Sequence, residues 1–507
     1  MNTAPEQQSW AGPLSAAVAR LCAGLQPQLS DKTAEGFDEV LRRLGAPLQV
    51  AVAGRIKSGK STLVNAMIGR RVAPTDVGEC TRLVTRFQYG TVDRVEVVFH
   101  DGRKQAIPFD PGGGIPADLG VDFDEVSHLE AYLTNAVLRD LTVIDTPGLG
   151  SLDSASVART EQALGTQQLD PVSRDAVIGA EAVLYVVTQG VRADDEQALA
   201  AFTAATASRE AGPVNAIALL NKADMIEADT VDGADDDVWK AAEILATKQS
   251  ELLKPKVADV LPVIGLLAET SETGGFTAPD AEALRSLAEL DESTRETLLL
   301  SADLFTSWEC DVPAGTRANL LERMDLHGVR CALDALDAQP DITAGELRRR
   351  IRDASGLASV LGRLDSVFRA RADGIKAAAA LASITALAQS SGDGDERQKV
   401  HDAIEGLLAR PEAHQLRVLE ALTMVAAGSV EMPPDLAEEV MQVGGSTDPG
   451  EQLGRPELPQ SELIELALER ANWWRSFSSF GATPAQSRVA HVVHRAYFLI
   501  WQQLRTR

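Results

Sequence analysis

Short runs of Val, Ile, Ala and Leu alternate with helical or turn-rich segments between about residues 48 and 264. Clear examples are LQVAVAG, LTVIDT, AVLYVVT and VNAIALLN. Apolar runs of this kind, separated by helices, are typical of a mainly parallel sheet that is buried on both faces. The pattern therefore predicts an α/β domain in this part of the chain.

Apolar residues recur at helical spacing on both sides of the α/β segment. The spacing predicts one or two helices over 13–45 and long helices beyond about residue 280. A final helix with an apolar face is expected over 484–507. We therefore divide the chain into N-terminal helices at 1–46, an α/β domain at 47–285 and an all-helical part at 286–507.

The composition is that of an acidic globular protein. Among 507 residues, 45% are hydrophobic and 24% are charged, which excludes a wholly disordered chain. The formal net charge is −26 at pH 7. An acid excess of this size argues against binding nucleic acid through a general electrostatic field, so we expect no nucleic-acid partner.

Cysteine use and hydropathy bear on the compartment. The four cysteines are far apart and form no CxxC pair, so we expect neither a disulfide framework nor a zinc site. The first ten residues lack the basic and apolar regions of a signal peptide. The longest nearly apolar stretch, 377–388, is too short to span a bilayer. We expect a cytoplasmic protein, and contact with a membrane surface stays open.

The run GRIKSGKS at 54–61 fits the phosphate-loop pattern GxxxxGK[ST]. It lies between the expected strand LQVAVAG and the helical run KSTLVNAMIG, which is the context the motif needs. Backbone N–H groups of such a loop turn toward phosphate oxygens at a helix N-terminus. We expect Lys60 to reach the β- and γ-phosphates and the Ser61 hydroxyl to bind Mg²⁺. The nucleotide-binding candidates here are Gly54, Lys57, Ser58, Gly59, Lys60, Ser61 and Thr62.

Two further motifs follow buried strands. In DTPG at 145–148, the carboxylate of Asp145 can hold the metal through its water shell, and the N–H of Gly148 can sense the γ-phosphate. In NKAD at 221–224, the carboxylate of Asp224 can accept from N1–H and the exocyclic amine of guanine, which adenine does not offer. We therefore expect Asn221, Lys222 and Asp224 to bind the nucleotide, and the nucleotide to be GTP.

A switch threonine is expected between the first two motifs. The run VGECTR contains Thr81, whose hydroxyl can bind Mg²⁺ once the γ-phosphate orders the loop. On spacing alone, Thr75 and Thr85 are alternatives. The expected catalytic residues are Lys57, Lys60, Thr81 and Gly148, and the expected metal ligands are Ser61, Thr81 and Asp145.

The strings GRIKSGKSTLVNAMIG, APTDVGECTRLVTRF, DTPG and NKAD, in this order and spacing, resemble the GTPase domain of bacterial dynamin-like proteins. The resemblance is strong over about 48–270 and concerns only architecture over the remaining helices. It implies an α/β GTPase domain on an elongated helical-bundle neck and trunk. It also implies hydrolysis of GTP with Mg²⁺, self-association through GTPase domains and action on membranes.

The resemblance departs from the family pattern inside the phosphate loop. Eukaryotic members carry Gln and Ser where this chain has Ile56 and Lys57. Ile56 cannot position a water molecule, and in the guanylate-binding branch an arginine at the place of Lys57 acts as an internal finger. Lys57 therefore resembles a built-in cation that is swung onto the phosphates when two GTPase domains meet. The alternative is that Lys57 points to solvent or binds phosphate passively.

The dynamin plan implies that 13–45, the helices after the GTPase domain and 484–507 form the neck, and that the segment between them forms the trunk. Uncharged stretches at 377–392 and 421–430, with a basic run beside the first, could touch an anionic bilayer. Close packing of Ala-rich helices is the alternative that we favour. We likewise place the aromatic run WWRSFSSF in a core at the neck–trunk joint.

The resulting hypothesis is a dynamin-type GTPase that couples hydrolysis to membrane remodelling or maintenance, by fission, fusion or tethering. It would lie on the inner face of the cell membrane as a peripheral protein. Its expected partners are an anionic phospholipid membrane, further copies of itself and, as an open possibility, a related dynamin-like protein. The alternative is a non-membrane GTPase switch such as a ribosome-assembly factor, which the acidic balance disfavours. An ATPase motor or transporter subunit is disfavoured by NKAD.

Overall fold

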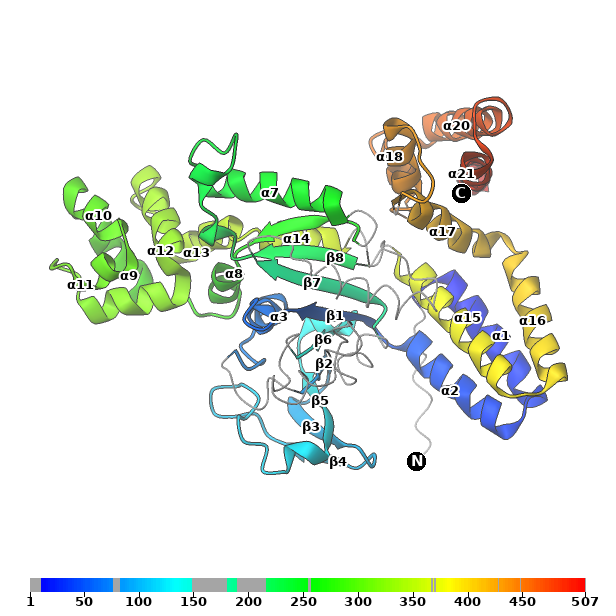
Figure 1. Cartoon of the computed structure of the whole chain (residues 1–507), viewed down its shortest axis with the longest axis horizontal. Coiled ribbons are helices and arrows are strands. Elements are labelled where there is room, and N and C mark those ends of the chain that lie inside the picture. The colour runs from blue at the N-terminus through cyan, green and yellow to red at the C-terminus, as the bar shows by residue number, and fades with distance from the viewer. Residues whose placement is uncertain are drawn as a thin grey trace, which may run out of the picture.

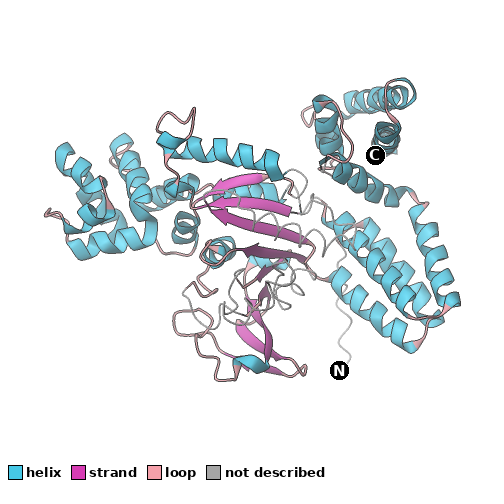
Figure 2. Cartoon of the chain, viewed as in Figure 1, coloured by secondary structure: helices cyan, strands magenta, loops and turns pink. Residues whose placement is uncertain are grey.

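The structure is a computed structural model of the chain. It describes residues 11–75, 83–147, 180–188, 216–253, 257–365, 368, 371–426, 428–446 and 448–506. Strands occupy the middle of the molecule, and helices extend from it at both ends of the long axis (Figures 1 and 2).

A single, mainly parallel sheet forms the centre of the molecule. Its strands are β1 (Leu48–Gly54), β2 (Thr85–Tyr89), β3 (Arg94–Phe99), β4 (Lys104–Ile107), β5 (Val126–Leu133), β6 (Leu141–Asp145), β7 (Ala182–Thr188), β8 (Ala216–Asn221) and β9 (Val260–Val263). Within the described residues they pair in the order β4-β3-β5-β2-β6-β1-β7-β8-β9. Strands β6, β1, β7, β8 and β9 are parallel, whereas β2 joins β6 antiparallel and β3 joins β4 and β5 antiparallel. The α/β fold expected from the apolar runs is confirmed.

The helices account for most of the remaining chain. They are α1 (Pro13–Leu25), α2 (Asp31–Gly45), α3 (Lys60–Ile68), α7 (Val238–Leu253), α8 (Gly265–Glu272), α9 (Ala278–Ala288), α10 (Glu292–Leu299), α11 (Ala302–Ser307), α12 (Ala314–Ala338), α13 (Ala344–Ala354), α14 (Leu357–Leu364), α15 (Ala372–Ser390), α16 (Gly394–Leu408), α17 (His414–Ala426), α18 (Pro434–Val443), α19 (Pro449–Gln452), α20 (Gln460–Phe480) and α21 (Pro484–Thr506). Among the described helices, none has both the length and the apolar character that crossing a membrane requires.

Both faces of the sheet are buried, which explains why its strands are almost uninterrupted apolar runs. On β1, Val50 and Val52 belong to one core, and Ala51 and Ala53 belong to the core on the other face. Helices α3 and α14 contribute to the first core. Helices α7, α8, α9, α12 and α13 contribute to the second, so the first helices after the sheet pack against the α/β domain itself.

Two further helical clusters lie at the other end of the molecule from α9–α12 (Figure 1). The first joins α1 and α2 to α15 and α16, and the second joins α17, α18, α20 and α21. The helices expected over 13–45 and 484–507 are present, with the break in the first at Pro27 in a 3-10 turn. The final helix packs on α20, α17 and α18 in the structure. The division into three domains stays a prediction.

Acidic side chains distant in sequence cap the N-terminal helices. The carboxylate of Asp373 accepts hydrogen bonds from the backbone N–H groups of Leu14 (3.0 Å) and Ser15 (2.7 Å), in the first turn of α1. The carboxylate of Glu396 accepts from Ser30 N–H and from the hydroxyl of Thr33 (3.0 Å) at the start of α2. Because a helix N-terminus carries unpaired N–H groups and partial positive charge, these contacts fix α1 and α2 on α15 and α16.

Candidate functional site

The phosphate loop connects the end of β1 to the start of α3. Its two glycines adopt positive φ angles, 150° at Gly54 and 89° at Gly59. A Cβ atom on Gly54 would lie 2.4 Å from the carbonyl oxygen of Val186, and one on Gly59 would lie 2.3 Å from the amide nitrogen of Asn221. Both positions therefore exclude a side chain, and the loop lies closely against β7 and the end of β8.

Lys60 lies inside this loop. Its ammonium group donates to the carbonyl oxygens of Gly54 (3.1 Å) and Arg55 (3.0 Å), and the residue is buried. Burial lowers the pKa of Lys60, and the nearby carboxylate of Asp145 opposes that shift. Among the described residues this ammonium group donates to carbonyl oxygens, and a buried cation in that setting is well placed to bind an anion such as phosphate.

Ser61 and Asp145, both expected to bind the metal, contact each other. The Ser61 hydroxyl donates to Oδ2 of Asp145 at 2.8 Å. Burial raises the pKa of Asp145 to about 6, against the influence of Lys60 and Ser61. Its other oxygen, Oδ1, is buried without a hydrogen-bond partner among the described residues, as is the hydroxyl of Ser58. A hydroxyl and an unpaired carboxylate oxygen fit Mg²⁺, which commonly takes few protein ligands and completes its shell with water and phosphate.

Asn221 ties the phosphate loop to the region beyond β9. Its side-chain N–H donates to the carbonyl oxygen of Ser58 (2.7 Å), and its side-chain oxygen accepts from the N–H of Gly265 (2.9 Å). Gly265 begins α8, so one buried amide holds three segments together. Sequence reasoning identified Asn221 but missed Gly265, because the loop after the last strand carries no charged or unusual motif.

Asp224 lies in a short 3-10 turn, Ala223–Met225, directly after β8. Burial raises its pKa, and the nearby charges of His327 and Lys222 oppose that shift. Lys222 itself has a φ of 59°, in the left-handed region that residues other than glycine rarely adopt. A half-buried carboxylate that makes no ion pair among the described residues suits a ligand with two N–H donors, such as the edge of guanine.

Lys57 and Ile56 lie on the solvent-exposed side of the phosphate loop. Both are solvent-exposed, and Lys57 has a φ of 60°. A lysine in the left-handed region costs on the order of 1 kcal/mol, and such strain often accompanies function. Lys57 is thus presented to solvent on the loop that would hold phosphate.

The remaining candidates divide into three groups. Thr81 and Gly148 lie outside the described residues. Thr62 lies in the first turn of α3. Of the alternatives to Thr81, Thr75 is exposed at the end of a described segment, and Thr85 is buried in β2, directly opposite Asp145 in the antiparallel register.

A buried polar network next to the site was missed by sequence reasoning. The side chain of Asn65 on α3 donates to Glu269 on α8 (2.8 Å) and to the carbonyl oxygen of Ala73 (3.0 Å), and it accepts from Val72 and Ala73. Glu269 also pairs with Arg71 at 3.1 Å. The network fixes the chain that leads from α3 toward the segment containing Thr81. A lone Asn in an apolar helix is its only sequence signal.

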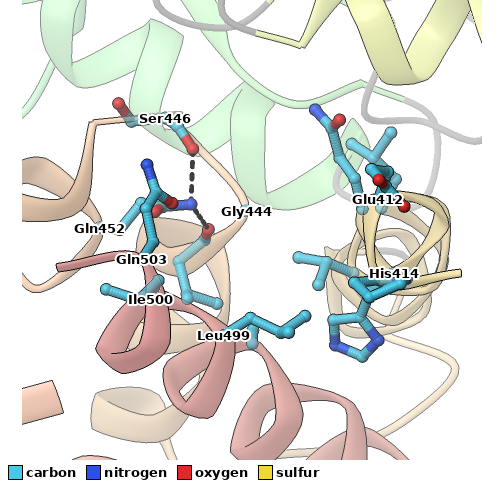
Figure 3. Close-up of a pocket in the computed structure, with 14 residues that line it drawn as sticks. Glu412, His414, Gly444, Ser446, Gln452, Leu499, Ile500 and Gln503 are labelled. Carbon is cyan, nitrogen blue, oxygen red and sulfur yellow. Dashed lines mark hydrogen bonds between the residues drawn. The ribbon is translucent and has the colours of Figure 1, made fainter. Parts of the chain in front are cut away.

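A pocket in the C-terminal cluster lies apart from the nucleotide site (Figure 3). Residues of α17, α21 and the segment around α19 line it. His414 is hydrogen-bonded to the carbonyl oxygen of Val492 at 2.9 Å. Gln452 donates to the carbonyl oxygens of Val443 (3.1 Å) and Ser446 (2.8 Å). Because these polar groups already hold neighbouring backbone, we interpret the pocket as a joint between helices.

Comparisons with known proteins agree with the motifs. Residues 50–201 match the profile of the Dynamin family. The chain is 31% identical over 445 residues to the isoniazid-induced protein IniC of Mycobacterium tuberculosis, covering 87% of this chain and 86% of that protein. It is 29% identical over 130 residues to the bacterial dynamin-like protein of Nostoc punctiforme, covering 23% of this chain and 18% of that protein.

Among solved structures, one similar chain belongs to an oligomerised bacterial dynamin pair, described as providing a mechanism for long-range sensing and tethering of membranes. The two chains are 12% identical and superpose with a TM-score of 0.34, over 98% of this chain and 92% of that one. The sequence similarities confirm the resemblance that the four motifs indicate.

Proposed function

The chain belongs to the dynamin family of GTPases, and from that premise we propose that it couples GTP hydrolysis to the remodelling or maintenance of a membrane. The observation that supports this proposal is a phosphate loop that contacts Asp145 and Asn221, on a sheet that is joined to separate helical clusters. These clusters extend away from the sheet at one end of the molecule, where they could act on a partner (Figure 1).

In the proposed reaction, Lys60 would leave its loop carbonyls for the β- and γ-phosphates of GTP, and Ser61 and Asp145 would hold Mg²⁺. Thr81 would add its hydroxyl to the metal, and the N–H of Gly148 would contact the γ-phosphate. Magnesium supplies charge neutralisation for the phosphates when it is bound.

At the guanine base, the carboxylate of Asp224 would accept hydrogen bonds from two guanine N–H groups. Asn221 would hold the phosphate loop in place through its hydrogen bonds with Ser58 and Gly265. Lys57, exposed and strained on the loop, would supply a cation to the transferring phosphate when two GTPase domains meet. Association of two copies through this face would therefore raise turnover.

Movement in the nucleotide domain could reach the helices through a buried ion pair. Lys376 on α15 lies 3.3 Å from Glu181, just before β7, and donates to the carbonyl oxygen of Arg43 at 2.9 Å. The second oxygen of Glu181 accepts from the N–H of Gln49 on β1 at 2.9 Å. These contacts join α15 and the end of α2 to the start of β1, which leads into the phosphate loop, and to the start of β7, which lies beside that loop. We propose this joint as the path between hydrolysis and helix movement.

The proposed partner is the anionic phospholipid surface on the inner face of the cell membrane. Further copies of the chain, or a related dynamin-like protein, would assemble with it there. We also propose that the cluster of α1, α2, α15 and α16 forms the neck and that the cluster of α17, α18, α20 and α21 forms the trunk, which moves 484–507 from the expected neck into the trunk. The three proposed activities, fission, fusion and tethering, all require membrane binding, so membrane binding is the property to test.

Flotation with vesicles tests the proposal. The wild-type protein, incubated with GTP, should rise with vesicles of phosphatidylcholine containing 30% phosphatidylglycerol and stay at the bottom with pure phosphatidylcholine. Lys60→Ala, which we expect to lose nucleotide binding, controls for coupling and should float less than the wild type under the same conditions. A wild-type protein that hydrolyses GTP but never floats would contradict the membrane function and favour a non-membrane GTPase switch.

A further inference from the structure

The last two helices form a hairpin whose charge differs from that of the whole chain. Residues 470–507 contain no Asp, Glu or Lys, whereas the first half of α20 carries Glu462, Glu465 and Glu469 and the whole chain has a net charge of −26. This hairpin lies at one end of the molecule, beyond α17 and away from the sheet (Figure 1). Its arginines are Arg470, Arg475, Arg488, Arg495, Arg505 and Arg507.

Most of these arginines face solvent and lack a carboxylate partner. Arg470 pairs with Glu439, but across the described residues no ion pair engages Arg475, Arg488, Arg495 or Arg505. Arg495 lies over the ring of Phe498 at 5.7 Å, and Arg505 lies over the ring of Trp501 at 4.7 Å. The outer face of α21 therefore combines free positive charge with partly exposed aromatic rings.

An aromatic stripe on α20 leads to the turn of the hairpin. Trp473 and Phe477 are one helical turn apart, and their rings stack at 5.5 Å with an angle of 9° between their planes. Phe480 follows at the end of the helix. Trp473 is 39% exposed and Phe480 is 94% exposed. A phenyl ring left almost wholly in water at the tip of a helical hairpin gains free energy from any apolar surface that it meets.

The tip is held in a defined conformation. Trp474, next to the stripe, is fully buried and its indole N–H donates to Glu439 at 3.0 Å. Across the turn, the Ser487 hydroxyl donates to the carbonyl oxygen of Ser478 at 2.9 Å. At the start of α21, the Thr483 N–H donates to the Gln486 side chain (2.9 Å), and the Gln486 N–H donates to the Thr483 hydroxyl. Phe480 is therefore presented by an ordered turn.

We propose that the turn of the α20–α21 hairpin is the surface that binds an anionic bilayer, with Phe480 entering the interface and the arginines binding lipid phosphates. This inference rests on the proposed membrane function and assigns it to particular residues. Basic residues near an anionic membrane contribute about 1 kcal/mol each, and aromatic rings favour the headgroup region. Positive charge would also suit nucleic acid, but the exposed phenyl ring and the aromatic stripe favour the bilayer.

The test compares variants of the full chain in the same flotation assay. Arg475→Glu/Arg488→Glu should weaken binding to vesicles with 30% phosphatidylglycerol by about 30-fold or more. Phe480→Ala should weaken it by about fivefold, without changing GTP turnover in the absence of vesicles. Matched controls are Arg348→Glu/Arg349→Glu on the exposed face of α13 and Leu300→Ala, a leucine that is 72% exposed. Both controls should bind as the wild type does.

The outcomes separate this inference from the membrane function. If the wild type floats and the hairpin variants float equally well, the hairpin assignment is wrong while membrane binding stands. If the α13 control loses binding instead, the basic run on that helix is the contact. If the arginine pair also governs binding to a 30-nucleotide single-stranded DNA and Phe480→Ala has no effect on flotation, the surface is a general polyanion site and the bilayer assignment fails.

Discussion

The nucleotide site and the C-terminal hairpin are organised in opposite ways. The nucleotide site is built at the ends of strands. Each of its motifs is a short stretch of sequence at the end of one strand, and it contacts the motif at the end of a neighbouring strand. Ser61 and Asp145 come together because β1 and β6 are parallel neighbours. The hairpin is built from two consecutive helices, α20 and α21, and the neighbouring cluster joins helices that are far apart in sequence, as the separation of 359 residues between Leu14 and Asp373 illustrates.

This difference explains what each region reveals about function. At the carboxyl ends of parallel strands, chemistry is concentrated in short motifs with a fixed local context, so a motif indicates a role directly. On helices, an apolar stripe indicates burial but not the partner, and an aromatic run looks the same in a core as on an exposed tip. The function that we propose for the helical region therefore rests on exposure and charge in the structure.

The largest expected effect is on base selection in the nucleotide site. Asp224→Asn replaces the carboxylate that would accept two guanine N–H groups with an amide that offers one acceptor and one donor group. We expect GTP affinity to fall by about 10³-fold, because guanine donors would be left unpaired, and xanthosine triphosphate to bind better than GTP. Titration with fluorescent GTP and xanthosine triphosphate measures both, and unchanged GTP affinity would contradict the assignment.

The contact between the sheet and helix α15 should be the point where a substitution lowers the stability of the protein most. Lys376→Met leaves Glu181 buried without its cation, and breaking such a pair typically costs about 3 to 5 kcal/mol. The free energy of unfolding in urea should fall by that amount, and Lys376→Met/Glu181→Gln should recover part of it. Lys399→Met, at an exposed lysine on α16, is the control. A loss no larger than that of the control would show that the pair does not hold the joint.

The next effect is a fall in GTP turnover with little change in nucleotide affinity, and it is expected at Lys57. If Lys57 supplies a cation to the phosphates, Lys57→Ala should lower GTP turnover by about 10²- to 10³-fold and change nucleotide affinity only a few-fold. Wild-type turnover should need no added K⁺ and should rise with protein concentration. Single-turnover hydrolysis in K⁺-free buffer measures these properties together. Normal turnover of the variant, or a strict K⁺ requirement in the wild type, would rule out this role for Lys57.

The smallest effect is expected at the cap of α1. Asp373→Ala removes the acceptor for the N–H groups of Leu14 and Ser15, and the loss of a helix cap costs about 1 to 2 kcal/mol. The urea midpoint should fall slightly while GTP affinity stays unchanged, because the cap lies in the helical cluster. Asp232→Ala, at an exposed loop position, controls for removal of a carboxylate. A fall in GTP affinity would mean that the two regions are more tightly coupled than we infer.

The sheet, the phosphate loop and the placing of Ser61 beside Asp145 could be predicted from sequence because each depends on a local pattern. Strand periodicity, glycines at positive φ and a carboxylate at a strand end all lie within single motifs. Gly265 and the Asn65–Glu269 contact could not be predicted, since both depend on which helix follows the last strand and how it packs.

The helical region was predictable as helices but only partly in its packing. The expectation that Ala-rich helix α15 packs closely is confirmed by the burial of Ala377, Ala380 and Ile384. The expectation of a core position for WWRSFSSF holds for Trp474 and is wrong for Phe480. The reason is the turn at Gly481, which ends α20 and leaves the last aromatic ring beyond the contact with α21.

The most direct test of the link between the two regions is GTP turnover with and without membranes. We expect wild-type turnover to rise when vesicles with 30% phosphatidylglycerol are added and to stay constant with pure phosphatidylcholine. At vesicle concentrations below saturation, Phe480→Ala should keep the basal rate and lose most of this stimulation, since its change lies in the hairpin and outside the nucleotide site. Equal turnover of the wild type with and without anionic vesicles, at concentrations where it floats, would contradict coupling between hydrolysis and the membrane.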